Sequence, residues 1–258
     1  MTEHITDFGH GFHHIRGQHR IGGLVDVGTH CSLVRLADGG AVFLDSYTLP
    51  GDILAQVRRM TANGADVRAI LNLHPFHTVH CEWMHRTFPD ARLYGTRRHR
   101  DRLPHLPWDD VLCEEDGLAE RFGADLNFSV PGGVDLVCEK ENVHFASVLA
   151  FHPGSGTIHV DDTLSCVQLP GPLRGLPLPM TGSLRFHPTL ASALKPEPGA
   201  ADAFTAWAYD LGADWHDARR VATAHNSVVE LHGDFPERIG EALGQVQPVL
   251  ARHRRRHG

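Results

Sequence analysis

The chain has 258 residues, 41% apolar and 21% charged, which is long and apolar enough to bury a core and excludes disorder as the main state. The formal net charge of −7 has the wrong sign for a protein that grips nucleic acid through a broad basic face. The 21 histidines are unusual, because imidazole is the commonest metal ligand in proteins. Composition therefore favours a metal-binding protein and no nucleic-acid partner.

Cysteine usage and the N-terminal sequence indicate a compartment. The five cysteines are odd in number and contain no CxxC pair, so the sequence predicts neither a disulfide framework nor a thiolate zinc site. The opening MTEHITDFGHGFHH lacks the pattern of a secretory signal, and no stretch approaches the length of a membrane span. We therefore expect a cytoplasmic protein with no membrane partner.

Strands and helices alternate in the first half of the chain. The turn signal Asp38-Gly39-Gly40 between two apolar runs predicts an antiparallel meander, and apolar residues recur at helical spacing after Pro50. The predicted elements are strands over 21–26, 31–36 and 41–44, a helix over 51–63, a strand over 67–73, a helix over 81–88, a strand over 92–94 and a helix over 96–103.

The second half is rich in strands and then in helices. We predict strands over 125–130, 134–138, 144–151 and 157–160, a helix over 201–211, a strand over 220–224 and a helix over 236–253. Residues 169–200 are so rich in proline and glycine that they predict a loop or lid near the functional cleft. No repeat of 20 to 50 residues is visible, so we expect one domain over 1–258.

The strongest functional signal is the sequence NLHPFHTVH at residues 72–80, which lies between a predicted strand and a predicted helix. His74, His77 and His80 are spaced three apart, and across such a turn they can converge on one ion. Three imidazoles at this spacing predict half of a site for zinc, iron or manganese.

Further candidate ligands stand next to other predicted strands. His144 opens one apolar run, Asp161 and Asp162 follow another directly, and His225 follows the strand over 220–224. Their order along the chain carries more information than any of them alone.

That order resembles the metallo-β-lactamase superfamily, in which an HxHxDH motif is followed by a later His, an Asp and a final His. The resemblance runs from about residue 23 to residue 225 and implies an α+β fold, a four-layer αββα sandwich. It places the ligand positions on His74, His77, His144, Asp162 and His225. The chain departs from the motif at Asn72, in the place of the first His, and at Phe76, in the place of the Asp.

The resemblance implies one or two divalent metal ions, with zinc favoured and iron or manganese as alternatives. The ligand sets would be His74, His144 and Asp162 around one ion, and His77, Asp162 and His225 around the other. The two departures make a single ion credible, and His80 or Glu82 is a candidate replacement for the missing groups. Asp161 and His159 are candidates to orient the ligand imidazoles by hydrogen bonds.

A metal ion with an open position activates water, so hydrolysis of a small ester, lactone or phosphodiester is the expected chemistry, with Asp162 holding the water. Two alternatives stay open: iron-dependent redox or oxygen chemistry on the same fold, and a non-catalytic relic that serves as a binding module. The sequence specifies neither the substrate nor the oligomeric state.

Two other histidine-rich segments carry no predicted function. His10, His13 and His14 near the N-terminus are expected to be solvated, and the C-terminal run RHRRRH is expected to be a soluble helix end.

Overall fold

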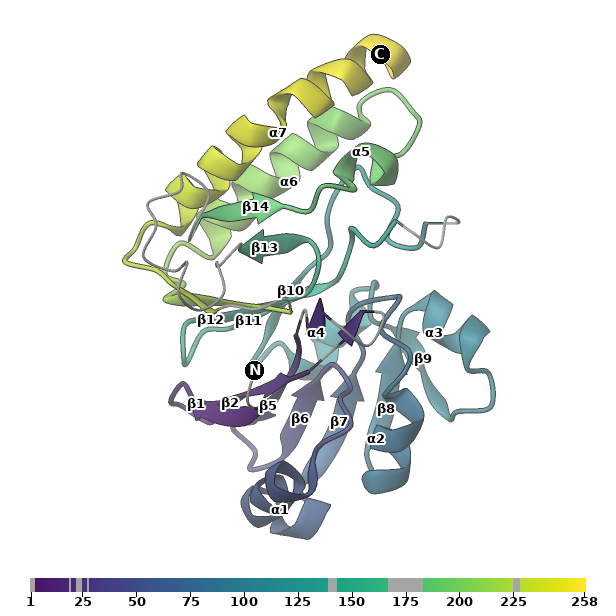
Figure 1. Cartoon of the computed structure of the whole chain (residues 1–258), viewed down its shortest axis with the longest axis vertical. Helices are drawn as coiled ribbons and strands as arrows, with labels where there is room; N and C mark the ends of the chain where they lie inside the picture. The colour runs from purple at the N-terminus through teal and green to yellow at the C-terminus, as the bar shows by residue number, and fades with distance from the viewer. Residues whose placement is uncertain are drawn as a thin grey trace.

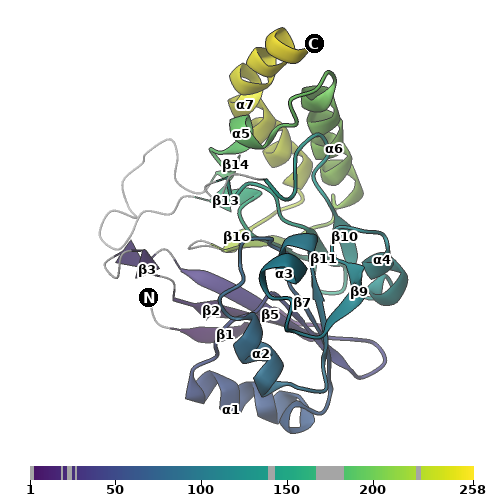
Figure 2. The ribbon, with the colours of Figure 1, turned by 90° about the vertical axis from the view of Figure 1, so that its right-hand side faces the viewer.

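Two β-sheets face each other, with helices on both outer faces (Figure 1). The computed structural model describes residues 3–18, 20–21, 25–26, 28–138, 143–166, 183–224 and 228–258. In the view turned by 90° the same layers follow one another, from α1 and α2 through the two sheets to α6 and α7 (Figure 2). The α+β class and the αββα sandwich predicted from the sequence are confirmed.

The first sheet changes from antiparallel to parallel pairing half-way across. Its strands, in spatial order, are β1 (His4–Asp7), β2 (Phe12–Gly17), β5 (Thr29–Arg35), β6 (Ala41–Leu44), β7 (Val67–Leu71), β8 (Arg92–Gly95) and β9 (Trp108–Leu112). Strands β1 to β6 pair antiparallel, and β6 to β9 pair parallel. Parallel neighbours need crossover connections, which α1 (Gly51–Met60), α2 (Cys81–Thr87) and α3 (Arg97–Arg102) provide.

The second sheet lies against the C-terminal helices. Its strands, in spatial order, are β10 (Asn127–Ser129), β11 (Leu149–His152), β12 (Thr157–Val160), β15 (Arg220–Thr223) and β16 (Val228–Glu230), and only β12 and β15 pair parallel. Helices α6 (Ala200–Asp214) and α7 (Phe235–His257) pack side by side on its outer face. The smaller elements are β3 (Arg20–Ile21), β4 (Val25–Asp26), the 3-10 turn Ala62–Gly64, α4 (Gly117–Phe122), β13 (Leu164–Cys166), β14 (Leu184–Phe186) and α5 (Leu190–Ala193).

The apolar core has three parts, one between each pair of adjacent layers. Alternate residues of a strand point to opposite faces, so Phe43 of β6 packs toward α1 and α2, whereas Val42 and Leu44 pack between the sheets. On β12, Ile158 and Val160 pack toward α6 and α7. Strands that are buried on both faces read as continuous apolar runs, and this is why their positions could be predicted.

The same alternation carries polar side chains into the space between the sheets. Cys31 and Leu33 of β5 pack toward the outer helices, so His30 and Ser32 point toward the second sheet. His14 of β2 lies in the same interior and is only 2% exposed. The prediction that His14 is solvated is therefore wrong, because β2 lies inside the sheet between β1 and β5.

Several other predictions need correction. The region predicted as a strand over 134–138 contributes only an isolated bridge between Val134 and Leu194, because it lies against α5 and not in a sheet. The strand predicted from residue 144 begins at Leu149, since the backbone of Val148 donates to Leu73 and that of Ser147 to Thr163 instead of a ladder.

Other boundaries also differ from the prediction. The helix predicted over 51–63 ends at Met60 in a 3-10 turn, and the strands β1, β2 and β9 and the helix α4 were not predicted. Residues 169–182 of the proline-rich region lie outside the described residues, as do 22–24 of the first predicted strand. The described end of the proline-rich region carries β14 and α5, so that part is not a plain loop.

The described part of the chain bears on two features that the sequence does not predict, disulfides and membrane-spanning helices. The five cysteines, all of them described, form no disulfide with one another, and all are buried. Among the helices that the structure describes, none combines the length and apolar character needed to cross a bilayer.

Candidate metal centre

The candidate site is built where three strands end. Asp45 follows β6 directly, His74 lies three residues beyond the end of β7, and Asp161 and Asp162 follow β12. The carboxyl ends of strands are where α/β sheets commonly place ligands, because the loops that leave them are free to carry polar groups. Residues from both sheets therefore meet at one end of the sandwich.

His74, His77 and Asp162 form a compact group whose ligand atoms all lie within 4.8 Å of one another. His74 Nε2 is 3.2 Å from Asp162 Oδ2, and the rings of His74 and His77 stack with their centroids 4.0 Å apart. His74 is fully buried, whereas the side chain of His77 is 26% exposed. The group thus opens to solvent on the side of His77.

Asp161 links this group to the interior of the sandwich. Its Oδ1 lies 3.4 Å from His77 Nδ1 and 3.3 Å from His30 Nε2. Burial alone would raise the pKa of Asp161, but the imidazoles of His77 and His30 hold it well below its usual range. Burial likewise opposes the charge on His77, but Asp161, and behind it Asp162 and Asp45, raise the pKa of His77 to about 9. In the absence of metal, Asp161 and His77 form an ion pair.

Asp45 anchors the loop that carries the histidines. Its Oδ1 accepts the backbone N–H of Leu73 at 2.8 Å and lies 3.4 Å from that of His74. Its Oδ2 lies 2.9 Å from Nε2 of His159, on the opposite sheet. Asp45 has a φ of 61°, a left-handed conformation that Asp and Asn tolerate better than most residues. One carboxylate thus fixes the loop to both sheets.

Asn72 takes a structural role at the position of the first His of the motif. Its Nδ2 donates to the carbonyl oxygen of Tyr94 at 2.9 Å, and its Oδ1 accepts from Ser46 Oγ at 2.6 Å and from Cys81 Sγ at 3.2 Å. Tyr94 lies on β8, Cys81 on α2 and Ser46 in the loop after β6. Asn72 therefore ties the end of β7 to its neighbours and presents no imidazole.

Phe76, at the position of the Asp of the motif, lies in a stack of flat groups at the rim. Its ring lies 4.3 Å from that of His144 and 18° from parallel to it, and the guanidinium carbon of Arg98 is 4.2 Å from the centroid on Phe76. The ring of His144 is 6.2 Å from that of His74. His144 is thus adjacent to the group without belonging to it, and Phe76 supplies no ligand atom.

The other predicted site residues are placed as follows. His80 Nδ1 lies 2.9 Å from Thr48 Oγ1, and its ring contacts Tyr47. Glu82 is paired with His105 at 2.8 Å and with Arg86 at 3.4 Å on an exposed face. Neither belongs to the clusters of ligand atoms found in the described chain. His225 lies outside the described residues.

The interior side of the site consists of His159, Asp45 and His30. His159 was predicted to orient a ligand, whereas Asp45 and His30 were not identified from the sequence. Ser32 Oγ lies 3.0 Å from His159 Nδ1, and the rings of His30 and His159 stack at 4.1 Å. A sequence signal for His30 did exist, because it and Ser32 share one face of a strand whose other face is apolar. A polar pair on a buried strand needs partners.

The residues fit a divalent metal ion. Two imidazoles and a carboxylate are the donor set of many zinc sites. His74 Nε2 is buried and makes no well-formed hydrogen bond among the described residues; it only faces Asp162 Oδ2 at 3.2 Å, an arrangement that a bound cation would complete.

No family model matches the sequence, and no curated protein does. Solved structures, however, match nearly the whole chain. A metallo-β-lactamase from Erythrobacter litoralis, with β-mercaptoethanol in its active site, is 14% identical, with a TM-score of 0.61 over 94% of this chain and 96% of that one. This chain has the metallo-β-lactamase fold.

Two further metallo-β-lactamases support the assignment of the fold. One from Pontibacter korlensis is 13% identical, with a TM-score of 0.58 over 95% of this chain and 99% of its own. FIM-1 from Pseudomonas aeruginosa, in a mono-zinc form, is 10% identical, with a TM-score of 0.57 over 95% of this chain and 96% of its own. The resemblance drawn from the histidine pattern is thus confirmed at the level of the metallo-β-lactamase fold.

Asp45 yields a first prediction. Asp45→Ala leaves the N–H of Leu73 and Nε2 of His159 without partners, and should lower the free energy of unfolding by about 2–4 kcal/mol. Asp45→Asn retains an acceptor and tolerates the left-handed backbone, so it should cost less than half as much. Urea denaturation of both variants measures the difference, and equal losses would contradict the anchoring role.

A second prediction concerns His99, which is fully buried in α3 and accepts the N–H of Thr96 through Nδ1 at 3.1 Å. Burial lowers its pKa from 6.5 to about 3, so between these values the unfolded chain binds a proton there that the folded chain does not. Stability should therefore fall as the pH drops below about 6.5. His99→Gln should flatten this fall by up to about 1.4 kcal/mol per pH unit. Urea denaturation of the metal-free proteins from pH 7 to about 4 tests this, and parallel curves would refute it.

Proposed function

We propose that the chain is a metal-dependent hydrolase in which His74, His77 and Asp162 hold a divalent ion. The observation that carries the proposal is the convergence of their ligand atoms within 4.8 Å at the carboxyl ends of strands from both sheets. When bound there, the ion lowers the pKa of a bound water and polarises an electrophilic centre. We infer zinc as the ion, because it favours a small set of nitrogen and oxygen donors.

The surrounding residues keep this set in place. Asp45 fixes the backbone at Leu73 and His74, and Asp161 contacts Nδ1 of His77, which leaves Nε2 as the nitrogen available to a ligand. A carboxylate behind a ligand imidazole fixes its orientation and increases its basicity. The 3.4 Å contact between Asp161 and His77 thus supports the proposal that Asp161 orients a ligand imidazole.

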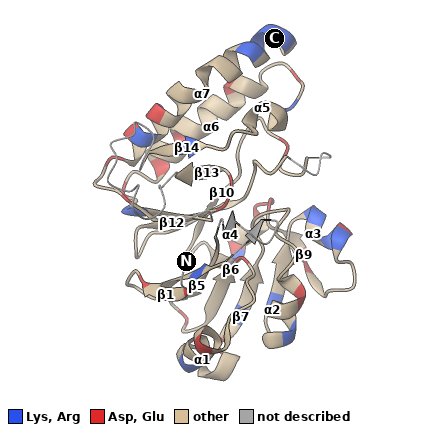
Figure 3. Cartoon of the chain, viewed as in Figure 1, with Lys and Arg blue, Asp and Glu red and all other residues tan. Residues whose placement is uncertain are grey.

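Charge at the rim favours an anionic substrate. The guanidinium of Arg98 lies over the ring of Phe76, on which the ring of His144 also stacks, and the side chain of His77 is partly exposed. Further arginines follow in α3, and they form a blue group at this edge of the molecule (Figure 3). A guanidinium binds phosphate and carboxylate oxygens with paired hydrogen bonds. We therefore propose a small ester that carries a negative charge, with phosphodiesters as the first class.

Metal content tests the ligand set. His74→Ala and His77→Ala should each lower the metal bound at the outer group by at least about tenfold and should lower the thermal midpoint with it, because a bound ion stabilises the folded state. His105→Ala is the matched control, since His105 is an exposed histidine paired with Glu82. Elemental analysis of untagged protein gives the ratio. A metal content unchanged in both variants would show that these residues hold no ion, and iron with a visible absorption band would favour redox chemistry.

Hydrolysis tests the chemistry. The zinc-loaded protein should cleave bis(p-nitrophenyl) phosphate faster than the protein stripped with chelator, and Asp162→Asn should lose at least about tenfold in kcat/KM. Absorbance of the released nitrophenolate measures both. p-Nitrophenyl acetate serves as the neutral comparison. A metal-replete chain that cleaves neither ester would favour a binding module over a hydrolase.

A further inference from the structure

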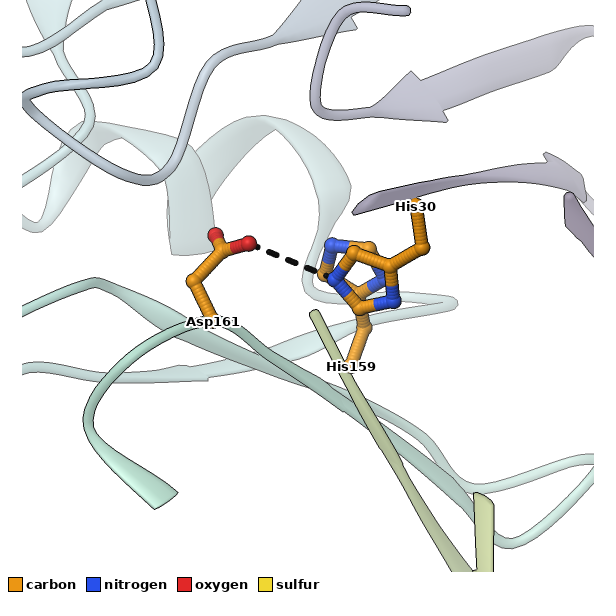
Figure 4. A group of neighbouring side chains, drawn as sticks. All are labelled: His30, His159 and Asp161. Carbon is orange, nitrogen blue, oxygen red and sulfur yellow. Dashed lines mark ion pairs between the residues drawn. The ribbon is translucent and has the colours of Figure 1, made fainter. Parts of the chain in front are cut away.

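A second cluster of ligand side chains lies deeper between the sheets. His30 from β5, His159 from β12 and Asp161 just beyond β12 have ligand atoms that all lie within 4.8 Å of one another. None of the three is more than 2% exposed. Figure 4 shows the carboxylate of Asp161 facing His30, with the ring of His159 stacked against that of His30. This inner group differs in composition from the outer group of His74, His77 and Asp162.

The inner group contains polar atoms that nothing in the described chain satisfies. Neither nitrogen of His30 and neither oxygen of Asp161 makes a well-formed hydrogen bond in the described chain, although both side chains are buried. His30 Nε2 and Asp161 Oδ1 face each other at 3.3 Å, and His77 Nδ1 lies 3.4 Å from the same oxygen. Leaving one such atom unpaired costs about 1–3 kcal/mol. Four buried polar atoms without a well-formed hydrogen bond indicate a missing partner.

The buried charges in this region also favour a cation as the missing partner. Three carboxylates, those of Asp45, Asp161 and Asp162, are buried at this end of the sandwich. Against them the described part of the chain sets His77, which pairs with Asp161, and Arg16, the one buried arginine or lysine, which also donates to the carbonyl oxygen of Thr223. Buried carboxylates are stable when a cation compensates them. A divalent cation would satisfy the charge and the unpaired atoms together.

We propose that His30, His159 and Asp161 bind a second divalent cation inside the sandwich, of the zinc class. This site goes beyond the proposed function, because it does not depend on hydrolysis at the outer group. It is also not the place that the family motif implies for a second ion, since that set consists of His77, Asp162 and His225, none of which belongs to the inner group.

Binding of an ion by the inner group requires two of its side chains to move. The rings of His30 and His159 are only 10° from parallel, and two parallel stacked rings cannot both aim a nitrogen at one ion. Binding would therefore require the ring of His30, which faces Asp161 at 3.3 Å, to turn. His159 would keep Ser32 at Nδ1 and exchange its contact with Asp45 for the ion, and Asp45 would retain its hydrogen bond to the backbone of Leu73. Ions enter past His77, which is partly exposed and lies 3.4 Å from Asp161.

The experiment counts zinc per chain after saturation and gel filtration, by elemental analysis, in wild type, His30→Gln, His14→Gln and His74→Ala. His14 is the matched control, because it is also a buried histidine of this interior, with its ring 5.2 Å from that of His30, but it belongs to neither group. We expect two ions in wild type and in His14→Gln, and one in His30→Gln. His74→Ala should lose the outer ion and retain the inner one.

The outcomes separate the inner site from the proposed function. One ion in wild type that His74→Ala removes and His30→Gln retains would overturn the inner site and leave the hydrolase proposal intact. A folded His30→Gln chain that keeps the wild-type count, or that loses both ions, would also overturn it, as would an ion lost from His14→Gln. If His30→Gln does not fold, Asp161→Asn replaces it, because it preserves the shape and removes the charge. Two ions retained in Asp161→Asn would overturn the proposal.

Discussion

The carboxylate of Asp45 is the constraint on which the rest of the site depends. One oxygen holds the backbone from which His74 projects, and the other contacts His159 on the facing sheet. The apolar contacts between the sheets are non-directional and would tolerate small shifts. Hydrogen bonds at 2.8–2.9 Å do not, so Asp45 sets the relative position of the two strand ends that carry the ligands.

The two departures from the family motif have different physical consequences. At Asn72 an amide stands where the motif has an imidazole. The amide joins the end of β7 to β8 and α2 by hydrogen bonds, so the position stabilises the strand end and supplies no metal ligand. Phe76 replaces a carboxylate with a flat apolar ring, which seats Arg98 and His144 at the rim. Positive charge therefore lies where the motif would have negative charge, and negative charge is concentrated below, at Asp161.

Much of the fold was predictable because its strands are buried on both faces and its crossover helices carry periodic apolar residues. The strand over 67–73, the histidines that follow it and the aspartates after β12 were found in this way. Short or exposed elements such as β9 and α4 lack such a pattern. The interior role of His14 and His30 was not predictable, because it depends on which strands become neighbours in the sheet. Asp45 was missed because a single aspartate after a strand resembles any turn residue.

The separation of the site residues along the chain bears on how the molecule assembles. Asp45 and His159 are 114 positions apart, and neither ligand group has all its members on one sheet. Closing so long a loop is entropically costly and must come before the contacts that reward it. The ligand groups therefore form only after both halves of the chain have folded and docked. An ion would act late in folding and would slow the separation of the halves, not guide their formation.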